Sequence, residues 1–301
     1  MLKTLFLFAL LLPVRLVAEQ KVDTEYNPTP FRCAYCQAAD APVVSIDNAH
    51  FNFHTLENRY APFAKVLAAD GFNVKSHSAL FSEESLEKTG ILVIANALNE
   101  KNETNWDLPI YSAFTRQEIN VLYRWVKQGG ALFLIADHMP WPAASADLAE
   151  VFGFGFFNGY VEVEGQSEQF FTQSAGSIAE SPVTPLKGPN AISSVQGFLG
   201  QGFSIPNKAI PVLQFTTPAI SWMPDKSWQI DDDTPFFDAT HLYQGALLTV
   251  GKGKLAIFGE AGMFTAQVSE DGEDSWKMGM NATSAKQNQQ LLLNIVRWLG
   301  E

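Results

Sequence analysis

Apolar runs of strand length alternate with segments of helical period through the first half of the chain. Residues 43–47, 72–78, 90–98 and 131–137 are predicted strands. The last of them, ALFLIAD, is continuous in its hydrophobicity, as a parallel strand covered on both faces should be. Strands and helices that alternate in this way predict a parallel, doubly wound α/β sheet with helices on both faces.

The clearest predicted helix spans residues 115–130. Thr115 and Glu118 have the spacing of a capping box at its start, and Gly129 follows its last apolar residues as a helix stop. The apolar positions in between fall on one face of the helix, which indicates that this face packs on the sheet. Further helices are predicted over residues 60–71, 145–153 and 284–300, the last with Ser284 as its N-cap.

The alternation is lost between residues 155 and 238. This stretch is rich in Gly, Pro, Ser and Phe and holds short β-like pieces, so we interpret it as an insertion or a β-rich cap. Residues 245–250 and 254–260 then resemble the two strands of a hairpin. We predict a single α/β domain over residues 43–301 that contains the insertion, preceded by an N-terminal extension over residues 19–42.

The first eighteen residues have the layout of a secretory signal peptide. Lys3 supplies a positive start, residues 4–12 are almost wholly apolar, and the segment ends in a small residue at Ala18. The apolar run is too short to span a bilayer as a stable anchor. We therefore predict cleavage near Glu19 and a periplasmic or secreted protein.

The charge balance excludes some classes of partner. The chain has 20 Lys and Arg against 32 Asp and Glu. Without Lys3 and Arg15 of the signal peptide the balance is 18 against 32, a net charge of −14. No basic field would steer such a protein to nucleic acid or to an anionic membrane. A small-molecule, glycan or peptide ligand is the expected partner, without stable membrane insertion.

Cys33 and Cys36 are the only cysteines, and they form a C-x-x-C pair in a Pro-rich stretch ahead of the predicted fold. A second C-x-x-C is missing, so a four-cysteine zinc site is excluded. A redox motif of the thioredoxin type would start a helix after a strand, which is not the setting here. A small local disulfide is therefore the favoured interpretation.

Polar side chains gather where three predicted strands end, and ligands of open α/β sheets bind at the carboxyl ends of the strands. The residues concerned are Asp47, His50, Asn52 and His54 after the first strand, Asp137 and His138 after the fourth, and Glu260 and Gln267 after the last. Parallel strands would bring them to one edge. The alternative, open for each residue alone, is that Asp47 caps a turn and the histidines pack against backbone.

Acids and imidazoles together are the ligands that a divalent metal such as zinc or manganese binds. His50, His54, Asp137 and His138 are the candidate metal ligands. The H-x-x-x-H spacing of the first two would place both imidazoles on one face if the loop turned helical. The Glu of an H-E-x-x-H motif is absent, so the pattern is not that of a zincin.

Two functions are open at this point. The first is a metal-dependent hydrolase in which Glu260 or Asp47 acts as the base. The second is a non-catalytic glycan- or peptide-binding domain that uses the same cleft, and under either hypothesis Asn52, Gln267 and Asn281 are candidate ligand contacts. No G-x-S-x-G motif occurs, so a serine nucleophile is not supported.

Four segments resemble one protein family: VVSIDNAHFNFHT, GGALFLIADHMP, GKGKLAIFGEAGMFTAQ and KMGMNATSAKQNQQLLLNIVRWL. The family is an exported bacterial one of unknown function within the class I glutamine amidotransferase-like superfamily. The resemblance implies a flavodoxin-like α/β sandwich. It does not imply amidotransferase activity, because those enzymes carry a nucleophilic cysteine at the turn where this chain has Asp137 and His138.

Overall fold

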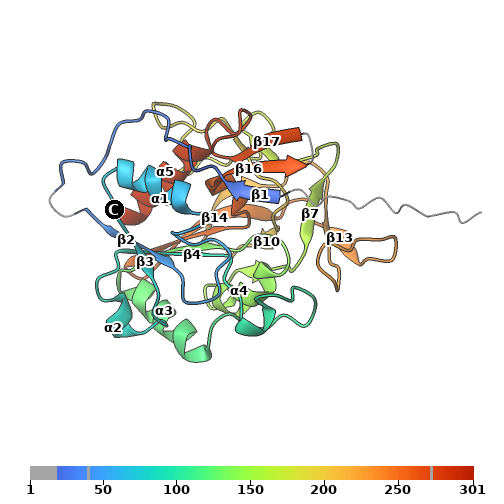
Figure 1. The fold of residues 1–301 in the computed structure, drawn as a ribbon, viewed down its shortest axis with the longest axis horizontal. Helices are drawn as coiled ribbons and strands as arrows, with labels where there is room; N and C mark the ends of the chain where they lie inside the picture. The colour runs from blue at the N-terminus through green and yellow to red at the C-terminus, as the bar shows by residue number, and fades with distance from the viewer. Residues whose placement is uncertain (1–18, 39–40, 272–273) are drawn as a thin grey trace, which may run out of the picture.

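The computed structural model describes residues 19–38, 41–271 and 274–301 (Figure 1). The predicted signal peptide, residues 1–18, lies outside the described residues, so its cleavage stays a prediction. Within the part of the chain that is described, no helix is long and apolar enough to cross a bilayer.

A nine-stranded sheet forms the centre of the molecule. Its strands, in order across the sheet, are β3 (Asn73–His77), β2 (Val43–Asp47), β4 (Ile91–Ala95), β5 (Ala131–Ile135), β15 (Gly253–Phe258), β14 (Tyr243–Val250), β10 (Phe203–Ser204) and β6 (Gly155–Phe156), and β11 (Ile210–Gln214) pairs with β14. The first five are parallel to one another, and the other four pair antiparallel.

The orientation of β15 decides what lies at the carboxyl edge of the sheet. It forms the predicted hairpin with β14, yet it runs parallel to β5, with Phe258 beside Ile135. The loops after β2, β4, β5 and β15 therefore leave the sheet on the same side.

Helices pack in two separate hydrophobic clusters. One cluster contains residues of α1 (Ala61–Ala69) and α5 (Asn288–Gly300), and the other contains residues of α2 (Glu83–Leu86), α3 (Arg116–Gln128) and α4 (Trp141–Glu150). Successive residues of β4 and β5 alternate between the two clusters, as side chains of a strand alternate between its faces. In Figure 1 the sheet lies between α1 and α5 above and α2 and α3 below.

The mixed α/β class predicted from the sequence is confirmed by this arrangement. The finer prediction of a flavodoxin-like, doubly wound sheet stays a prediction. The capping box at Thr115 and Glu118 is confirmed, because each side chain accepts a hydrogen bond from the other's backbone amide.

The predicted start of the C-terminal helix at Ser284 is wrong. Turns occupy residues 282–287, and the helix begins at Asn288. The Gln287 side chain is used instead to anchor a distant loop, where its Oε1 atom accepts hydrogen bonds from the Ser193 and Ser194 amides, both at 2.9 Å. These long-range bonds fix the residues that the sequence pattern assigned to the first helical turn.

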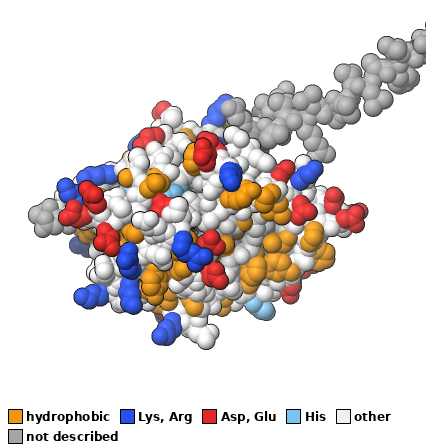
Figure 2. All heavy atoms as spheres, turned by 90° about the horizontal axis from the view of Figure 1, so that it is seen from below, with side chains coloured by type: hydrophobic (Ala, Val, Ile, Leu, Met, Phe, Trp, Pro, Cys, Tyr) orange, Lys and Arg blue, Asp and Glu red, His pale blue; other side chains and the backbone are white. Residues whose placement is uncertain are grey.

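Residues 155–238, all of them described, form short strands and no helix. Besides β6, β10 and β11, these are β7 (Tyr160–Val163), β8 (Phe170–Thr172), β9 (Ser194–Gln196), β12 (Ala219–Trp222) and β13 (Phe236–Asp238). A three-stranded sheet has the order β13-β12-β7, and β8 pairs with β9. On the side of the molecule where β13 lies in Figure 1, Figure 2 shows exposed hydrophobic side chains gathered beside acidic ones. The domain boundaries stay a prediction.

A separate three-stranded sheet joins the N-terminal extension to the segment that follows β15. It consists of β1 (Glu19–Val22), β16 (Ala266–Asp271) and β17 (Asp274–Gly279), all antiparallel. β1 lies in the predicted N-terminal extension, so this extension pairs with the strand that follows β15. Two short 3₁₀ helices, η1 (Glu100–Asn102) and η2 (Gly262–Phe264), complete the fold.

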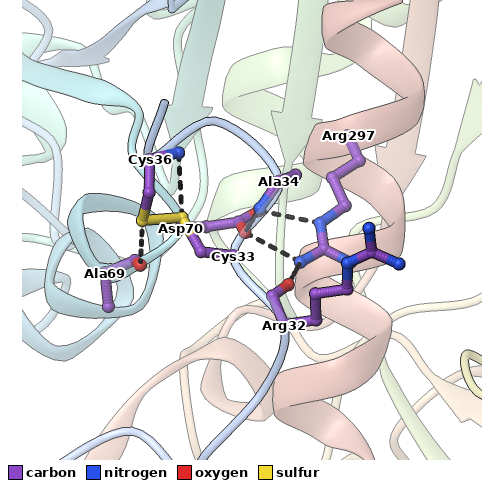
Figure 3. Close-up of a disulfide and its surroundings, with 7 residues drawn as sticks. All are labelled: Arg32, Cys33, Ala34, Cys36, Ala69, Asp70 and Arg297. Carbon is purple, nitrogen blue, oxygen red and sulfur yellow. Dashed lines mark hydrogen bonds and ion pairs between the residues drawn. A yellow bond between two sulfur atoms is a disulfide. The ribbon is translucent and has the colours of Figure 1, made fainter. Parts of the chain in front are cut away.

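The predicted disulfide between Cys33 and Cys36 is confirmed. It lies in a loop that docks on the end of α1 through Asp70, a fully buried residue (Figure 3). The Asp70 carboxylate accepts a hydrogen bond from the Ala34 amide at 2.7 Å and two from the Arg297 guanidinium, each at 2.7 Å. One carboxylate thus connects the disulfide loop, α1 and α5.

Candidate functional site

A cavity of about 240 Å³ lies at the carboxyl edge of the parallel strands. Loops that follow β2, β5 and β15 line it, together with side chains from β1, β16 and β17. Residues predicted from the sequence are among its lining: His54, Asp137, His138, Glu260 and Gln267. The parallel sheet brings these residues together although they are far apart in the chain.

Glu260 is a buried carboxyl group that follows β15. Its Oε2 atom accepts hydrogen bonds from the amides of Phe198 at 2.8 Å and Leu199 at 3.1 Å, and Oε1 accepts one from Gly262 at 2.7 Å. Burial, and then the charge of Asp137, raise the pKa of Glu260 to about 8 against these bonds. The raised pKa favours the protonated form of Glu260 near neutral pH, in which the carboxyl group can donate a proton.

Asp137 follows β5 and is the second carboxyl group of the cavity. Its Oδ1 atom accepts a hydrogen bond from the His138 amide at 2.8 Å, and Oδ2 accepts one from the Ala261 amide at 3.2 Å. The second bond ties the loop after β5 to the residue that follows Glu260. Two acids on neighbouring strands thus share a largely buried setting, in which one negative charge opposes the formation of the other.

The His138 ring is neutral and has a defined tautomer. Nδ1 lies 2.7 Å from the carbonyl oxygen of Met139, which can only accept, so the proton is on Nδ1. Burial lowers the pKa of His138 below its usual value. Rings of Trp141, Tyr160 and Trp228 surround the imidazole with centroids 4.6 to 4.8 Å away. Among the described residues nothing hydrogen-bonds Nε2, which is left with a lone pair.

His54 has the opposite tautomer, and Asn96 sets it. The Asp137 amide donates to Asn96 Oδ1 at 3.0 Å, so the Asn96 side-chain nitrogen faces His54 Nδ1, 3.1 Å away. That ring nitrogen must accept, and the proton of His54 is on Nε2. Burial, followed by the charge of Arg59, lowers the pKa of His54 far below its usual value. The two cavity histidines are therefore one donor and one acceptor.

Sequence reasoning missed Asn96. It is fully buried, directly follows β4 and has a φ of 51°, in the left-handed region that Asn enters more readily than most residues. The predicted strand over residues 90–98 contains Asn96, because the apolar run continues beyond it. The observed strand ends at Ala95, so Asn96 follows its strand as Asp137 follows β5.

Arg59 is a second residue that the sequence did not single out. Its guanidinium lies over the Phe53 ring, 3.9 Å from the centroid, and lines the cavity. Its buried Nε atom has no hydrogen-bond partner, and within the described part of the chain Arg59 forms no ion pair. A positive charge is thus held in the cavity without a counter-ion among the described residues.

Gln267 and Asn281 have different surroundings. The Gln267 side-chain nitrogen donates to Thr265 Oγ1 at 2.9 Å, and its Oε1 atom is buried without a partner in the cavity wall. Asn281 is not part of the cavity lining. Its side-chain nitrogen donates to Asp23 at 2.9 Å and to the carbonyl oxygen of Gln267 at 3.0 Å, so it joins β16 to the segment after β1.

Asp47, His50 and Asn52 lie outside the cavity, which corrects the expectation that His50 faces the same cleft as His54. His50 Nδ1 is 2.9 Å from Asp47 Oδ2, and His50 Nε2 is 2.9 Å from Glu118 Oε1. Asn52 accepts a hydrogen bond from the His50 amide at 3.1 Å. The loop is not helical, so the H-x-x-x-H spacing does not place the two imidazoles on one face.

The proposed metal ligands do not form a cluster. Among residues 19–38, 41–271 and 274–301, no group of three or more His, Cys, Asp or Glu side chains is arranged to hold a metal ion. Both ring nitrogens of His50 are bound to carboxylates, and Nδ1 of His54 faces Asn96. The donors present do not fit a zinc or manganese centre, and metal binding itself stays a prediction.

Comparisons with known proteins support the fold. No family model matches the sequence, and a comparison with curated proteins finds no match. The solved "mmIFT52 N-terminal domain" has a TM-score of 0.60 at 15% identity, covering 86% of this chain and 97% of that one. A ThuA-like protein from Bacteroides uniformis has a TM-score of 0.45 at 13% identity, covering 90% and 95%. The first of these likenesses shows a shared fold and nothing about activity. Membership of the exported family stays a prediction.

Proposed function

We propose that the protein is a hydrolase for a small polar molecule and that it works by acid–base catalysis in this cavity. One observation carries the proposal: a neutral His138 with an open Nε2 lines the same cavity as Glu260, whose pKa is raised to about 8. At pH 7 one group is ready to accept a proton and the other to donate one. Pairs of groups with separated pKa values are typical of acid–base sites.

The reaction would use each tautomer in a different role. His138 Nε2 accepts a proton from water, and the resulting hydroxide attacks the electrophilic carbon of the substrate. The His54 Nε2–H group and the Arg59 guanidinium stabilise the negative charge that develops on the substrate. Glu260 donates its proton to the leaving group. Transfer of the proton from His138 to Glu260 through solvent would restore the starting state.

The size and lining of the cavity favour a small substrate with a polar or anionic group. The cavity volume of about 240 Å³ is below the usual range for ligand pockets. Aromatic rings of Phe53, Trp141 and Trp228 supply apolar walls. The side chains of Arg59 and Gln267 line the cavity and add a positive charge and an amide to its wall.

A panel of chromogenic esters, amides and glycosides tests the proposal. Turnover by the wild type should fall about 10²–10⁴-fold in His138→Gln and Glu260→Gln, because each variant removes a proton-transfer group. His241→Gln, an exposed histidine outside the cavity, is the matched control and should leave the rate unchanged. Equal rates in all four proteins would contradict the assignment of both residues.

The alternative function is a glycan- or peptide-binding protein that uses the same cavity without chemistry. The observation that favours it is the aromatic wall around His138, since rings of this kind bind apolar faces of ligands. A ligand that binds to the wild type and is recovered unchanged, with equal affinity for Glu260→Gln, would support this alternative.

Export belongs to the proposal as well. The Cys33–Cys36 disulfide agrees with an oxidising compartment, where such bonds persist. Intact-mass measurement of the protein from its native host tests it. A mass that corresponds to a chain beginning near Glu19 would support export, and a chain that retains Met1 would contradict it.

A further inference from the structure

The outer face of the β13-β12-β7 sheet carries a second cavity, which shares no lining residue with the first. It has a volume of about 670 Å³ and is lined by side chains of β7, β12 and β13 and of the segments that follow them. The strand pairing places Glu162, Ile220 and Asp238 directly opposite one another across the three strands. One row of this face is therefore an apolar side chain between two carboxylates.

Aromatic side chains form the next row. Trp222 is paired with Phe236, and their ring centroids are 5.2 Å apart. The Trp222 ring nitrogen donates to Glu162 Oε2 at 2.9 Å, which holds the indole beside the carboxylate. Phe236 is 60% exposed and Ile220 is 37% exposed. Exposed apolar side chains that adjoin in this way are typical of interaction sites rather than of ordinary surface.

The charge of the face is negative and unbalanced. Glu162, Glu164 and Asp238 all line the cavity or its rim. Within the described part of the chain none of the three forms an ion pair with Lys or Arg. His241 is the one basic side chain in the lining. A partner that carries positive charge would gain both the carboxylates and the faces of the aromatic rings.

From this arrangement we propose that the outer face of the β13-β12-β7 sheet binds a basic peptide segment. Lysine or arginine side chains of the peptide lie between Glu164 and Asp238, and their aliphatic parts cover Ile220 and Phe236. β13 is the edge of its sheet, so the backbone of the peptide has a strand beside which to lie. The size of the cavity accommodates a few residues of such a segment.

The aromatic row of this face continues to the small cavity, because Tyr160 is paired with Trp222. Tyr160 at the start of β7 stacks on His138 with ring centroids 4.8 Å apart. Trp228, in the connection between β12 and β13, lies 4.6 Å from the same ring. A peptide on the outer face would therefore be bound next to the proposed catalytic site, but its binding does not depend on the proposed chemistry.

Calorimetric titration with capped penta-lysine tests the proposal at low salt. The double variant Glu164→Gln/Asp238→Asn should weaken binding at least about threefold, as expected for the loss of two exposed charge contacts. Phe236→Ala should weaken it about threefold through the lost ring contact. Raising the salt concentration should weaken binding to the wild type more than to the double variant.

Matched variants in and beside α2 control for the acidity of the whole protein. Glu84→Gln/Glu87→Gln removes the same charge from exposed positions in this helix and just after it. Leu80→Ala removes another exposed apolar side chain, from the loop before the helix, so both variants should bind penta-lysine as the wild type does. Equal weakening by the two double variants would overturn the proposal. Binding of maltopentaose in place of penta-lysine, or a dimer in sedimentation that Phe236→Ala dissociates, would also overturn it.

Discussion

The Nε2 atom of His50, in the loop after β2, lies 2.9 Å from Oε1 of Glu118 in the first turn of α3. The other ring nitrogen binds Asp47 at 2.9 Å, and all three side chains are buried. Two carboxylates on either side of one imidazole stabilise its protonated form. This arrangement joins the loop that leads to His54 with the start of a helix 68 residues away in the chain.

We predict that His50→Gln destabilises the protein by about 3 kcal/mol at pH 6, because it leaves buried carboxylates without their partner. Burial lowers the pKa of His50, but Asp47 and Glu118 outweigh it, so the pKa is raised above 6.5. This stabilisation is complete below pH 6.5 and is lost as the pH rises through the folded-state pKa. Urea unfolding at pH 6 and pH 9 should show a smaller cost at pH 9. A cost that grows with pH would contradict this account.

Glu118 is a partner of His50 that the sequence pattern did not predict. The capping-box pattern predicted that its carboxylate binds the Thr115 amide, and Oε2 does so at 3.0 Å. The same pattern says nothing about Oε1, which accepts from His50 and from the Phe81 amide. The sequence pattern predicts hydrogen bonds between residues that are close in the chain. Bonds to distant residues, such as that between His50 and Glu118, depend on which helix packs beside the loop.

The residues that follow β5 and β15 could be placed together from the sequence because of the sheet topology. Parallel strands share one carboxyl edge, so residues that end β5 and β15 had to meet once β15 was parallel to β5. Asp137, His138 and Glu260 meet there as expected. Arg59 and Phe53 were not foreseen, because they lie in loops whose course depends on long-range contacts and leaves no periodic signal.

A pair of substitutions at Asn96 separates side-chain bonds from backbone strain. We expect Asn96→Gly to cost about 2 kcal/mol, because the Asp137 amide and His54 Nδ1 lose buried partners. Asn96→Ala should cost about 1 kcal/mol more, since Ala is unfavourable at a φ of 51°. Denaturant unfolding measures both. In ¹⁵N spectra the single Nε2–H tautomer of His54 should become mixed in Asn96→Gly, and an unchanged tautomer would contradict the role of Asn96.

Asp70 should matter more to stability than the disulfide beside it. The Cys33→Ser/Cys36→Ser variant should lose about 2 kcal/mol or less, because the closed loop is very short. Asp70→Asn should lose about 3 kcal/mol, because it breaks a buried ion pair with Arg297. Thermal unfolding of the two variants decides the order. A larger loss for the cysteine variant would show that the disulfide, rather than the carboxylate, secures the loop.

Metal binding can be measured without knowing a substrate. We expect millimolar zinc or manganese to leave the melting temperature of the wild type unchanged, because the cavity donors do not form a cluster. Parallel titrations of His54→Ala and His138→Ala serve as controls. A rise in melting temperature for the wild type that both variants abolish, and that disappears at acidic pH, would restore the metal-dependent hydrolase as the better hypothesis.

The pH dependence of turnover tests the proposed roles of His138 and Glu260 together. His138 must be unprotonated, and burial lowers its pKa below 6.5, so the rate should decline only below that pH. Glu260 must be protonated, so the rate should also decline as the pH rises through about 8.

The raised pKa of Glu260 further means that its ionisation destabilises the fold as pH rises. Glu260→Gln should therefore be inactive yet at least as stable as the wild type at pH 9. An inactive variant that is also less stable at pH 9 would assign Glu260 a structural role, held by its three amide donors.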